Sequence, residues 1–233
     1  MTKETLKKIL AGKTCRVDEE LLTRDGADIQ SWRIFKIMAE FVNGFELLRK
    51  YGLAATIFGS SRCNSGNEVY QMSEDLAAKL SKEGFTIMTG GGGGVMEGAN
   101  KGAYEAKGKS VGLNIRLPHD AQEPNHYTTD AEHFDYFFTR KVMLSYASEV
   151  YIFLPGGFGT LDEFFEIVTL IQTKKIKNIP IVLIGKEFWM PLLVWIEDAM
   201  LHRYRTIDAK DMEIYHLVDS VDEAVSYIVE KVC

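Results

Sequence analysis

The sequence predicts an α/β fold: a Rossmann-like, doubly wound parallel sheet with helices on both faces. Short apolar runs of strand length alternate with longer segments whose apolar residues recur every three or four positions. Strands that alternate with helices form parallel sheets, and these bind ligands at the carboxyl ends of their strands. Glycine-containing turns follow three predicted strands, at residues 59–62, 90–94 and 156–159. We therefore expect the three turns to meet at one edge of the sheet.

Composition indicates one globular domain with an N-terminal addition. The 233 residues are 46% apolar and 26% charged, with a net charge of −6, which argues against nucleic acid or a membrane surface as a partner. The three cysteines are scattered and form no C-x-x-C pair, so we expect no disulfide, no zinc site and a reducing compartment. With neither an apolar run of membrane-span length nor a secretion signal, the predicted location is the cytoplasm.

Two regions are predicted along the chain. Residues 1–50 form an N-terminal arm and a helix, and residues 51–233 form a nucleotide-binding catalytic domain. The arm, residues 1–30, is polar and contains a short helical pattern at residues 4–10. The helix over residues 31–50 has a broad apolar face, which either the core or a partner must cover. We expect the core to cover it.

The first two strands, residues 54–58 and 85–88, flank a helix over residues 67–82 that Gly84 closes. Glycine and hydroxyl residues at the end of a first strand can line a ligand crevice, although an ordinary turn has the same composition. The second strand leads into five consecutive glycines, which are entropically unfavourable unless backbone must approach a ligand or another backbone closely. No G-K-[ST] follows them, so this is not a Walker loop. These two turns supply the candidate binding residues Gly59, Ser60, Ser61, Gly91 and Gly92.

The middle of the chain contributes a helix at residues 95–106, a strand at 110–115, a turn-rich loop at 117–130 and a helix at 137–144. The last of these carries Arg140 and Lys141 beside aromatic residues. A solvated corner is one interpretation of this pair. We favour an arginine that packing holds so that its planar guanidinium meets a phosphate or a carboxylate.

The central stretch is a buried strand at residues 150–154, the turn Pro155 to Gly159 and a helix that runs through Ile171. Free N–H groups and the positive end of the helix dipole point to one place, which predicts an anion site for a phosphate. Thr160 is expected to cap this helix, with Asp162 and Glu163 in its first turn. Both acids can serve as helix-start residues, but a carboxylate beside a phosphate favours a catalytic role for Glu163. A strand at residues 180–184, a helix with Pro191 in its first turn, a strand at 214–218 and a helix at 221–232 complete the chain.

The motif at residues 155–163, P-G-G-F-G-T-L-D-E, resembles the LOG family, formerly labelled lysine decarboxylase-like. Gly59-Ser60-Ser61, Gly91-Gly92-Gly93 and Arg140-Lys141 extend the resemblance over about residues 54–200. The resemblance implies a phosphoribohydrolase that cleaves the N-glycosidic bond of a nucleoside 5′-monophosphate, such as AMP or a cytokinin ribotide, to free base and ribose 5-phosphate. It also implies a homodimer or larger homo-oligomer, with no cofactor and no metal.

Roles follow from the resemblance by motif position. Arg140 and Glu163 match the catalytic pair. The matched substrate contacts are Lys141, Gly157, Phe158, Gly159, Thr160, Leu161, Asp162 and Thr169, and Gly156 is a further candidate binding residue of the same turn. Residues 137–139 read F-F-T where the family has M-H-x, which affects the expected base preference more than the chemistry.

Elementary chemistry fits the same roles. Breaking the C1′–N bond builds positive charge on the ribose, which Glu163 can stabilise while it positions or deprotonates the attacking water. Arg140 can either orient Glu163 or bind the phosphate. The alternative function is a non-catalytic nucleotide or molybdenum-cofactor carrier, which would not require Glu163 beside Arg140. A decarboxylase would need a lysine Schiff base with pyridoxal phosphate, and no lysine stands in a recognisable context for one.

Overall fold

The computed structural model describes residues 31–116 and 124–232. The predicted arm and its short helical pattern lie outside these residues. The chain divides into two compact units, Met1–Ala39 and Glu40–Cys233, and helix α3 (Ser31–Leu48) runs through the division. The predicted boundary at residue 50 stays a prediction. The second unit contains every strand of the described residues.

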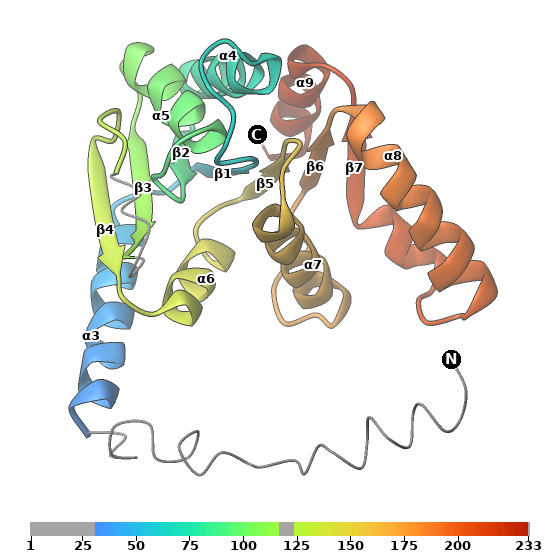
Figure 1. The fold of residues 1–233 in the computed structure, drawn as a ribbon, viewed down its shortest axis with the longest axis horizontal. Coiled ribbons are helices and arrows are strands. Elements are labelled where there is room, and N and C mark those ends of the chain that lie inside the picture. Colours follow the sequence, from blue (N-terminus) through green and yellow to red (C-terminus); the bar gives the residue numbers. More distant parts are fainter. Residues whose placement is uncertain (1–30, 117–123, 233) are drawn as a thin grey trace, which may run out of the picture. The chain divides into compact units, whose positions relative to one another are not determined.

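In the described part of the chain, seven strands form one sheet in which every neighbouring pair is parallel (Figure 1). Their spatial order is β4-β3-β2-β1-β5-β6-β7. The strands are β1 (Ala54–Phe58), β2 (Thr86–Thr89), β3 (Ser110–Ile115), β4 (Asp130–Phe134), β5 (Val150–Phe153), β6 (Ile181–Ile184) and β7 (Tyr215–Val218). The predicted doubly wound parallel sheet is confirmed.

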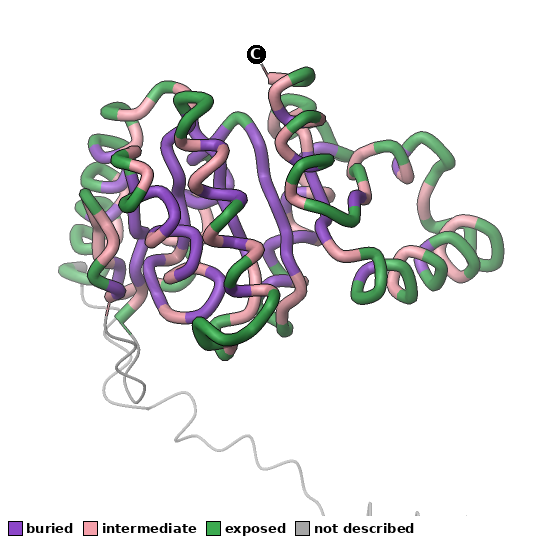
Figure 2. Tube along the Cα trace, turned by 90° about the horizontal axis from the view of Figure 1, so that it is seen from above, coloured by how far each residue is buried: buried purple, intermediate pink, exposed green. Residues whose placement is uncertain are grey.

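Helices cover both faces of this sheet, as predicted. They are α4 (Glu68–Lys82), α5 (Val95–Glu105), α6 (Phe137–Ser145), α7 (Phe158–Gln172), α8 (Lys186–Trp195) and α9 (Val221–Val232). Buried side chains of α4, α5 and α9 form one core layer, and those of α6, α7, α8 and the end of α3 form the other. Figure 2 shows the strands buried between helices whose outer sides are exposed. A π-helix (Ile196–Arg203) and a 3₁₀ helix (Ala209–Glu213) follow α8.

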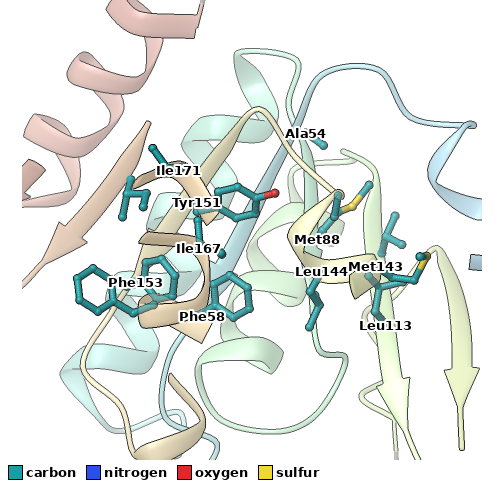
Figure 3. Packing of buried hydrophobic residues seen from close by; sticks show 14 of the residues in the cluster. Ala54, Phe58, Met88, Leu113, Met143, Leu144, Tyr151, Phe153, Ile167 and Ile171 are labelled. Atoms are coloured by element: carbon teal, nitrogen blue, oxygen red, sulfur yellow. The ribbon is translucent and has the colours of Figure 1, made fainter. Parts of the chain in front are cut away.

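Alternate residues of the two central strands point into opposite core layers, as expected for strands buried on both faces. The last residues of β1 and β5, Phe58 and Phe153, are register partners whose rings stack with centroids 4.8 Å apart. Figure 3 shows both rings in the layer that α7 covers. Phe153 also meets Phe164 of α7, with ring centroids 5.6 Å apart. This aromatic contact fixes the ends of two strands relative to the helix that follows one of them.

Three elements differ from what the sequence predicts. Strand β4 was not predicted. It is an edge strand whose residues are mostly half-buried, so it lacks an apolar run. Pro191 is not in the first turn of α8, because Gly185, at φ +100°, lets the helix begin at Lys186. The core covers only one side of the end of α3, since Leu47 is buried while Val42 and Phe45 are exposed.

No helix in the described residues is long and apolar enough to cross a membrane.

Candidate active site

The sheet reverses its strand order between β1 and β5. From β1 the chain proceeds through β2 and β3 to β4 on one side, and from β5 it proceeds to β7 on the other. Such a switch point leaves a crevice at the carboxyl ends of the two strands, where α/β proteins bind ligands. The loops that follow β1 and β5 border this crevice.

The three glycine turns meet at this edge, as the sequence predicts. Ser60 N donates to Pro155 O at 3.1 Å, and Val95 N donates to Ser60 O at 2.8 Å. Gly94 adopts φ +68°, and a Cβ there would lie 2.2 Å from Ser60 O. Only glycine fits this contact, so one role of the glycine run is to let α5 begin against the first turn.

A cavity of about 790 Å³ opens where the turns meet. This volume is in the range of small-molecule sites. The predicted residues that line it are Gly59, Ser60, Ser61, Arg140, Gly156, Gly157, Phe158, Gly159, Thr160, Leu161 and Glu163. The structure therefore brings the candidate catalytic pair and residues of all three turns into one cavity, with Gly90 from the second turn.

Eight further lining residues were not singled out from the sequence: Phe58, Arg62, Gly90, Met96, Ile115, Phe137, Leu144 and Phe188. Gly90 and Arg62 adjoin predicted residues, so the turn motifs could have indicated them. Phe188 comes from α8, and nothing in its local sequence places it here. Most of these further lining residues are apolar, which makes part of the cavity lining hydrophobic.

Other predicted contacts lie away from the cavity lining. Gly91 and Gly92 are buried, and their carbonyl groups accept hydrogen bonds from Asn125 N at 2.9 Å and Asn125 Nδ2 at 3.0 Å. Thr169 is exposed on α7 and donates to Phe165 O at 2.6 Å. Asp162 and Lys141 pair with each other beside the cavity, with 2.5 Å between Nζ and Oδ2.

Helix α7 begins two residues before Thr160, which changes the roles predicted for its first residues. Gly157 is the N-cap, so Thr160 is the third helical residue and not the cap. A Cβ on Gly156 would lie 2.1 Å from Thr160 Oγ1, so the glycine makes room for this buried hydroxyl. Asp162 and Glu163 lie in the second turn, not the first. Neither acid therefore serves as a cap for the helix start.

The start of α7 has the geometry of an anion site. The first N–H groups of a helix have no partner within it, and among the described residues none accepts from Phe158 N or Gly159 N. Both residues line the cavity. Phe158 is 93% exposed, so its side chain packs little against the rest of the protein.

Glu163 is a buried carboxyl group at the cavity. It is 4% exposed, and its Oε2 has no hydrogen-bond partner among the described residues. Burial raises the pKa of Glu163 to about 7, with Lys141 and Arg140 opposing the rise and Glu166 and Asp162 adding to it. A pKa near neutrality suits a group that must take up and release a proton.

Arg140 is held by packing, as the sequence predicts, and not by a carboxylate. Its Cζ lies 5.0 Å from the centre of the Phe137 ring, and its Nη1 would lie 3.4 Å from a Cβ on Gly90. Burial lowers the pKa of Arg140, while Glu163 opposes this. Within the described residues Arg140 forms no ion pair, and its buried Nε has no hydrogen-bond partner. Its guanidinium group is therefore available to a ligand.

The helix that carries Arg140 is anchored by Glu40 of α3, a residue that sequence reasoning did not single out. The Glu40 carboxylate is buried and accepts from Asp135 N at 2.7 Å, Tyr136 N at 3.4 Å and Thr139 Oγ1 at 2.5 Å. These donors surround the start of α6, whose N-cap, Tyr136, supplies no side-chain cap of its own. A carboxylate from α3 thus replaces the local cap and fixes the helix beside the cavity. The only sequence signal was an acid within an apolar helical pattern.

Comparison with known proteins identifies the family. A family model described as "Possible lysine decarboxylase" matches residues 96–228, more than half of the chain. The chain belongs to this family, the LOG family. A LOG-family cytokinin riboside 5′-monophosphate phosphoribohydrolase from Rhodococcoides fascians is 27% identical over 173 residues, covering 69% of this chain and 85% of that protein. The enzyme of the same name from Mycobacterium tuberculosis is 30% identical over 103 residues, covering 44% and 55%.

Solved structures support the LOG-type fold. The molybdenum cofactor binding protein of Rippkaea orientalis has a TM-score of 0.57 at 18% identity, covering 78% of this chain and 98% of that one. The molybdenum cofactor carrier protein of Chlamydomonas reinhardtii also gives 0.57 at 18% identity, covering 76% and 96%. At this identity the likeness concerns the fold alone.

Proposed function

We propose that this LOG-family protein is a nucleoside 5′-monophosphate phosphoribohydrolase. It adds water across the C1′–N bond of AMP or a cytokinin ribotide and yields free base and ribose 5-phosphate. The observation that carries the proposal is one helix with two functions: α7 offers free N–H groups at its start and the buried Glu163 in its second turn, both bordering one cavity. Five residues separate Phe158 from Glu163, about 7.5 Å along the helix axis. A ribose 5-phosphate can bridge that separation.

Each part of the cavity has a role in this reaction. The N–H groups of Phe158 and Gly159 hold the 5′-phosphate and thereby fix the ribose. As the C1′–N bond breaks, the Glu163 carboxylate stabilises the positive charge on the ribose and takes a proton from the attacking water. Arg140, which lacks a carboxylate partner in the described residues, contacts the substrate directly. The apolar wall formed by Met96, Ile115, Phe137 and Phe188 receives the base.

The test is a panel of nucleoside monophosphates assayed for released base by chromatography. We expect base to be released from AMP or another monophosphate. For the matching nucleosides kcat/KM should be at least about 10²-fold lower, since they lack the phosphate and its charge-assisted contacts. Equal cleavage of nucleosides would remove the phosphate anchor from the proposal. Tight nucleotide binding without any base release would instead support the non-catalytic carrier.

We also propose that the protein works as a homodimer or larger homo-oligomer. The exposed side chains include Phe138 of α6, its C-cap Tyr146, and Val42 and Phe45 of α3. The Phe45 and Tyr146 rings are 6.4 Å apart, so exposed aromatic side chains of α3 and of the end of α6 adjoin each other. Exposed apolar side chains that gather on a surface are typical of protein–protein interfaces. Light scattering of the full chain should give at least twice the 26.3 kDa chain mass. Phe138→Glu should lower that mass, and a monomeric wild type would contradict the proposal.

A further inference from the structure

We propose that Lys141 and Glu166 form a positioning pair: Glu166 holds the Lys141 ammonium against Glu163, and neither side chain contacts the substrate. This deepens the proposed function and rests on it. It also differs from the family resemblance, which matches Lys141 to a substrate contact. The consequence is that Lys141 and Glu166 control the charge state of Glu163 and not affinity for the nucleotide.

The geometry places Lys141 among acids and behind the cavity wall. Its Nζ lies 2.5 Å from Asp162 Oδ2, 2.9 Å from Glu166 Oε2 and 3.8 Å from Glu163 Oε2. The Lys141 side chain is 16% exposed and does not line the cavity, whereas its neighbour Arg140 does. The ammonium thus donates a hydrogen bond to Asp162 and forms an ion pair with Glu166, and both acids belong to α7. The Lys141 side chain can reach the substrate only by giving up these contacts.

The distance to Glu163 suits an electrostatic role. At 3.8 Å the ammonium is beyond hydrogen-bonding distance of Oε2 but close enough for a strong Coulombic effect in a buried setting. Glu163 therefore gains a compensating charge while its Oε2 stays free of donors among the described residues. This oxygen is itself buried, so the ammonium acts on the carboxylate from inside the protein.

Glu166 is the residue that makes this arrangement specific. It lies three residues after Glu163 on α7, so both carboxylates project from the same side of the helix toward Lys141. Burial lowers the pKa of Lys141, but the hydrogen bond to Asp162 and the ion pair with Glu166 outweigh this and raise it, so the ammonium stays charged. The ionisable groups that act on Glu163 are Arg140 and Lys141 from α6 and Asp162 and Glu166 from its own helix. Two positive and two negative charges therefore oppose each other around Glu163.

The experiment compares pH profiles of kcat for Lys141→Met and Glu166→Gln. Activity needs the Glu163 carboxylate, so losing the ammonium should raise the midpoint of the acidic limb by about one pH unit. Glu166→Gln should lower the midpoint, because the amide oxygen can still hold the ammonium while the negative charge beside Glu163 is gone. KM for the nucleotide should stay within about threefold of wild type in both variants. Each substitution changes the pKa of Glu163 by about one unit but removes no contact with the bound nucleotide. Lys141→Arg should restore the wild-type midpoint.

A matched control comes from the opposite face of the sheet. Lys101 pairs with Glu74 at 2.9 Å and is similarly shielded, at 26% side-chain exposure. Lys101→Met should leave the midpoint unchanged. If Lys141→Met raises KM about tenfold or more with an unmoved midpoint, Lys141 is a substrate contact and the proposal is overturned.

A second readout separates this proposal from the proposed function. If the wild type releases no base from any nucleotide, the carboxyl carbon of Glu163 can still be titrated by NMR in ¹³C-glutamate-labelled protein. The midpoint should rise in Lys141→Met and fall in Glu166→Gln. A wild-type midpoint in Glu166→Gln, with no rise in Lys141→Met, would overturn the pair even if the enzyme were active. Should Lys141→Met fail to fold, a wild-type midpoint in Glu166→Gln would be enough to overturn it.

Discussion

Glu163→Gln is expected to abolish base release while the protein still binds nucleotide. The amide has the size of the carboxyl group, so it keeps the packing of a residue that is 4% exposed. It cannot take a proton from water, and it offers less negative charge to the ribose as the C1′–N bond breaks. We expect kcat to fall by about 10³-fold, within the range for loss of a general acid–base group. Chromatography of released base gives kcat, and calorimetric titration of AMP should give a Kd within about threefold of wild type.

Arg140→Met is expected to weaken both binding and turnover, whereas Glu163→Gln weakens turnover alone. The methionine side chain keeps much of the packing against Phe137 but loses the guanidinium group that faces the cavity. Binding and turnover should then fall together, with Kd weaker by about 10-fold to 100-fold, as expected for the loss of a charge-assisted contact. Near wild-type turnover in Glu163→Gln would refute the hydrolytic mechanism. Unchanged binding and turnover in Arg140→Met would refute direct contact between the arginine and the substrate.

The fold could be predicted because most of its elements are strongly patterned. Strands β1, β5 and β6 are buried along their length and read as apolar runs, and the helices between them show clear periodicity. Strand β4 was not predicted, because its five residues, D-A-E-H-F, lie at a sheet edge and only Phe134 is buried. Edge strands carry polar side chains, so their pattern does not differ from that of a loop.

The site was predictable only down to the level of the turns. Sequence adjacency grouped Arg140 with Lys141 and Asp162 with Glu163, but consecutive helical residues point roughly 100° apart. Accordingly Arg140 and Glu163 line the cavity, while Lys141 and Asp162 pair beside it. Thr169 is six residues beyond Glu163, roughly 240° around the helix, and is exposed. Which neighbour faces the cavity depends on where α7 begins, and the glycines on both sides of Phe158 made that start ambiguous.

Glu163→Gln is also expected to stabilise the protein, increasingly so as the pH rises. The folded-state pKa of about 7 lies above the ordinary value of 4.5, chiefly because of burial. Between these two values the unfolded chain has released the proton while the folded protein retains it. The contribution of Glu163 to the free energy of unfolding is therefore fully present below about pH 4.5. It is lost as the pH rises through the folded-state pKa near 7. A neutral glutamine in this position suffers no such loss.

The pKa difference sets the size of this stabilisation. Raising the value from 4.5 to about 7 corresponds to about 3 kcal/mol. Urea unfolding should therefore show Glu163→Gln close to wild type near pH 5 and more stable by about 3 kcal/mol near pH 8. The exposed Glu83 is the matched control, since its carboxyl group meets solvent in both states and Glu83→Gln should follow wild type at every pH. If the Glu163→Gln and wild-type curves run parallel across this range, Glu163 is already ionised without penalty in the folded protein. It would then not be the buried base on which the proposed hydrolysis relies, because such a base reduces the stability of the folded protein when it is charged.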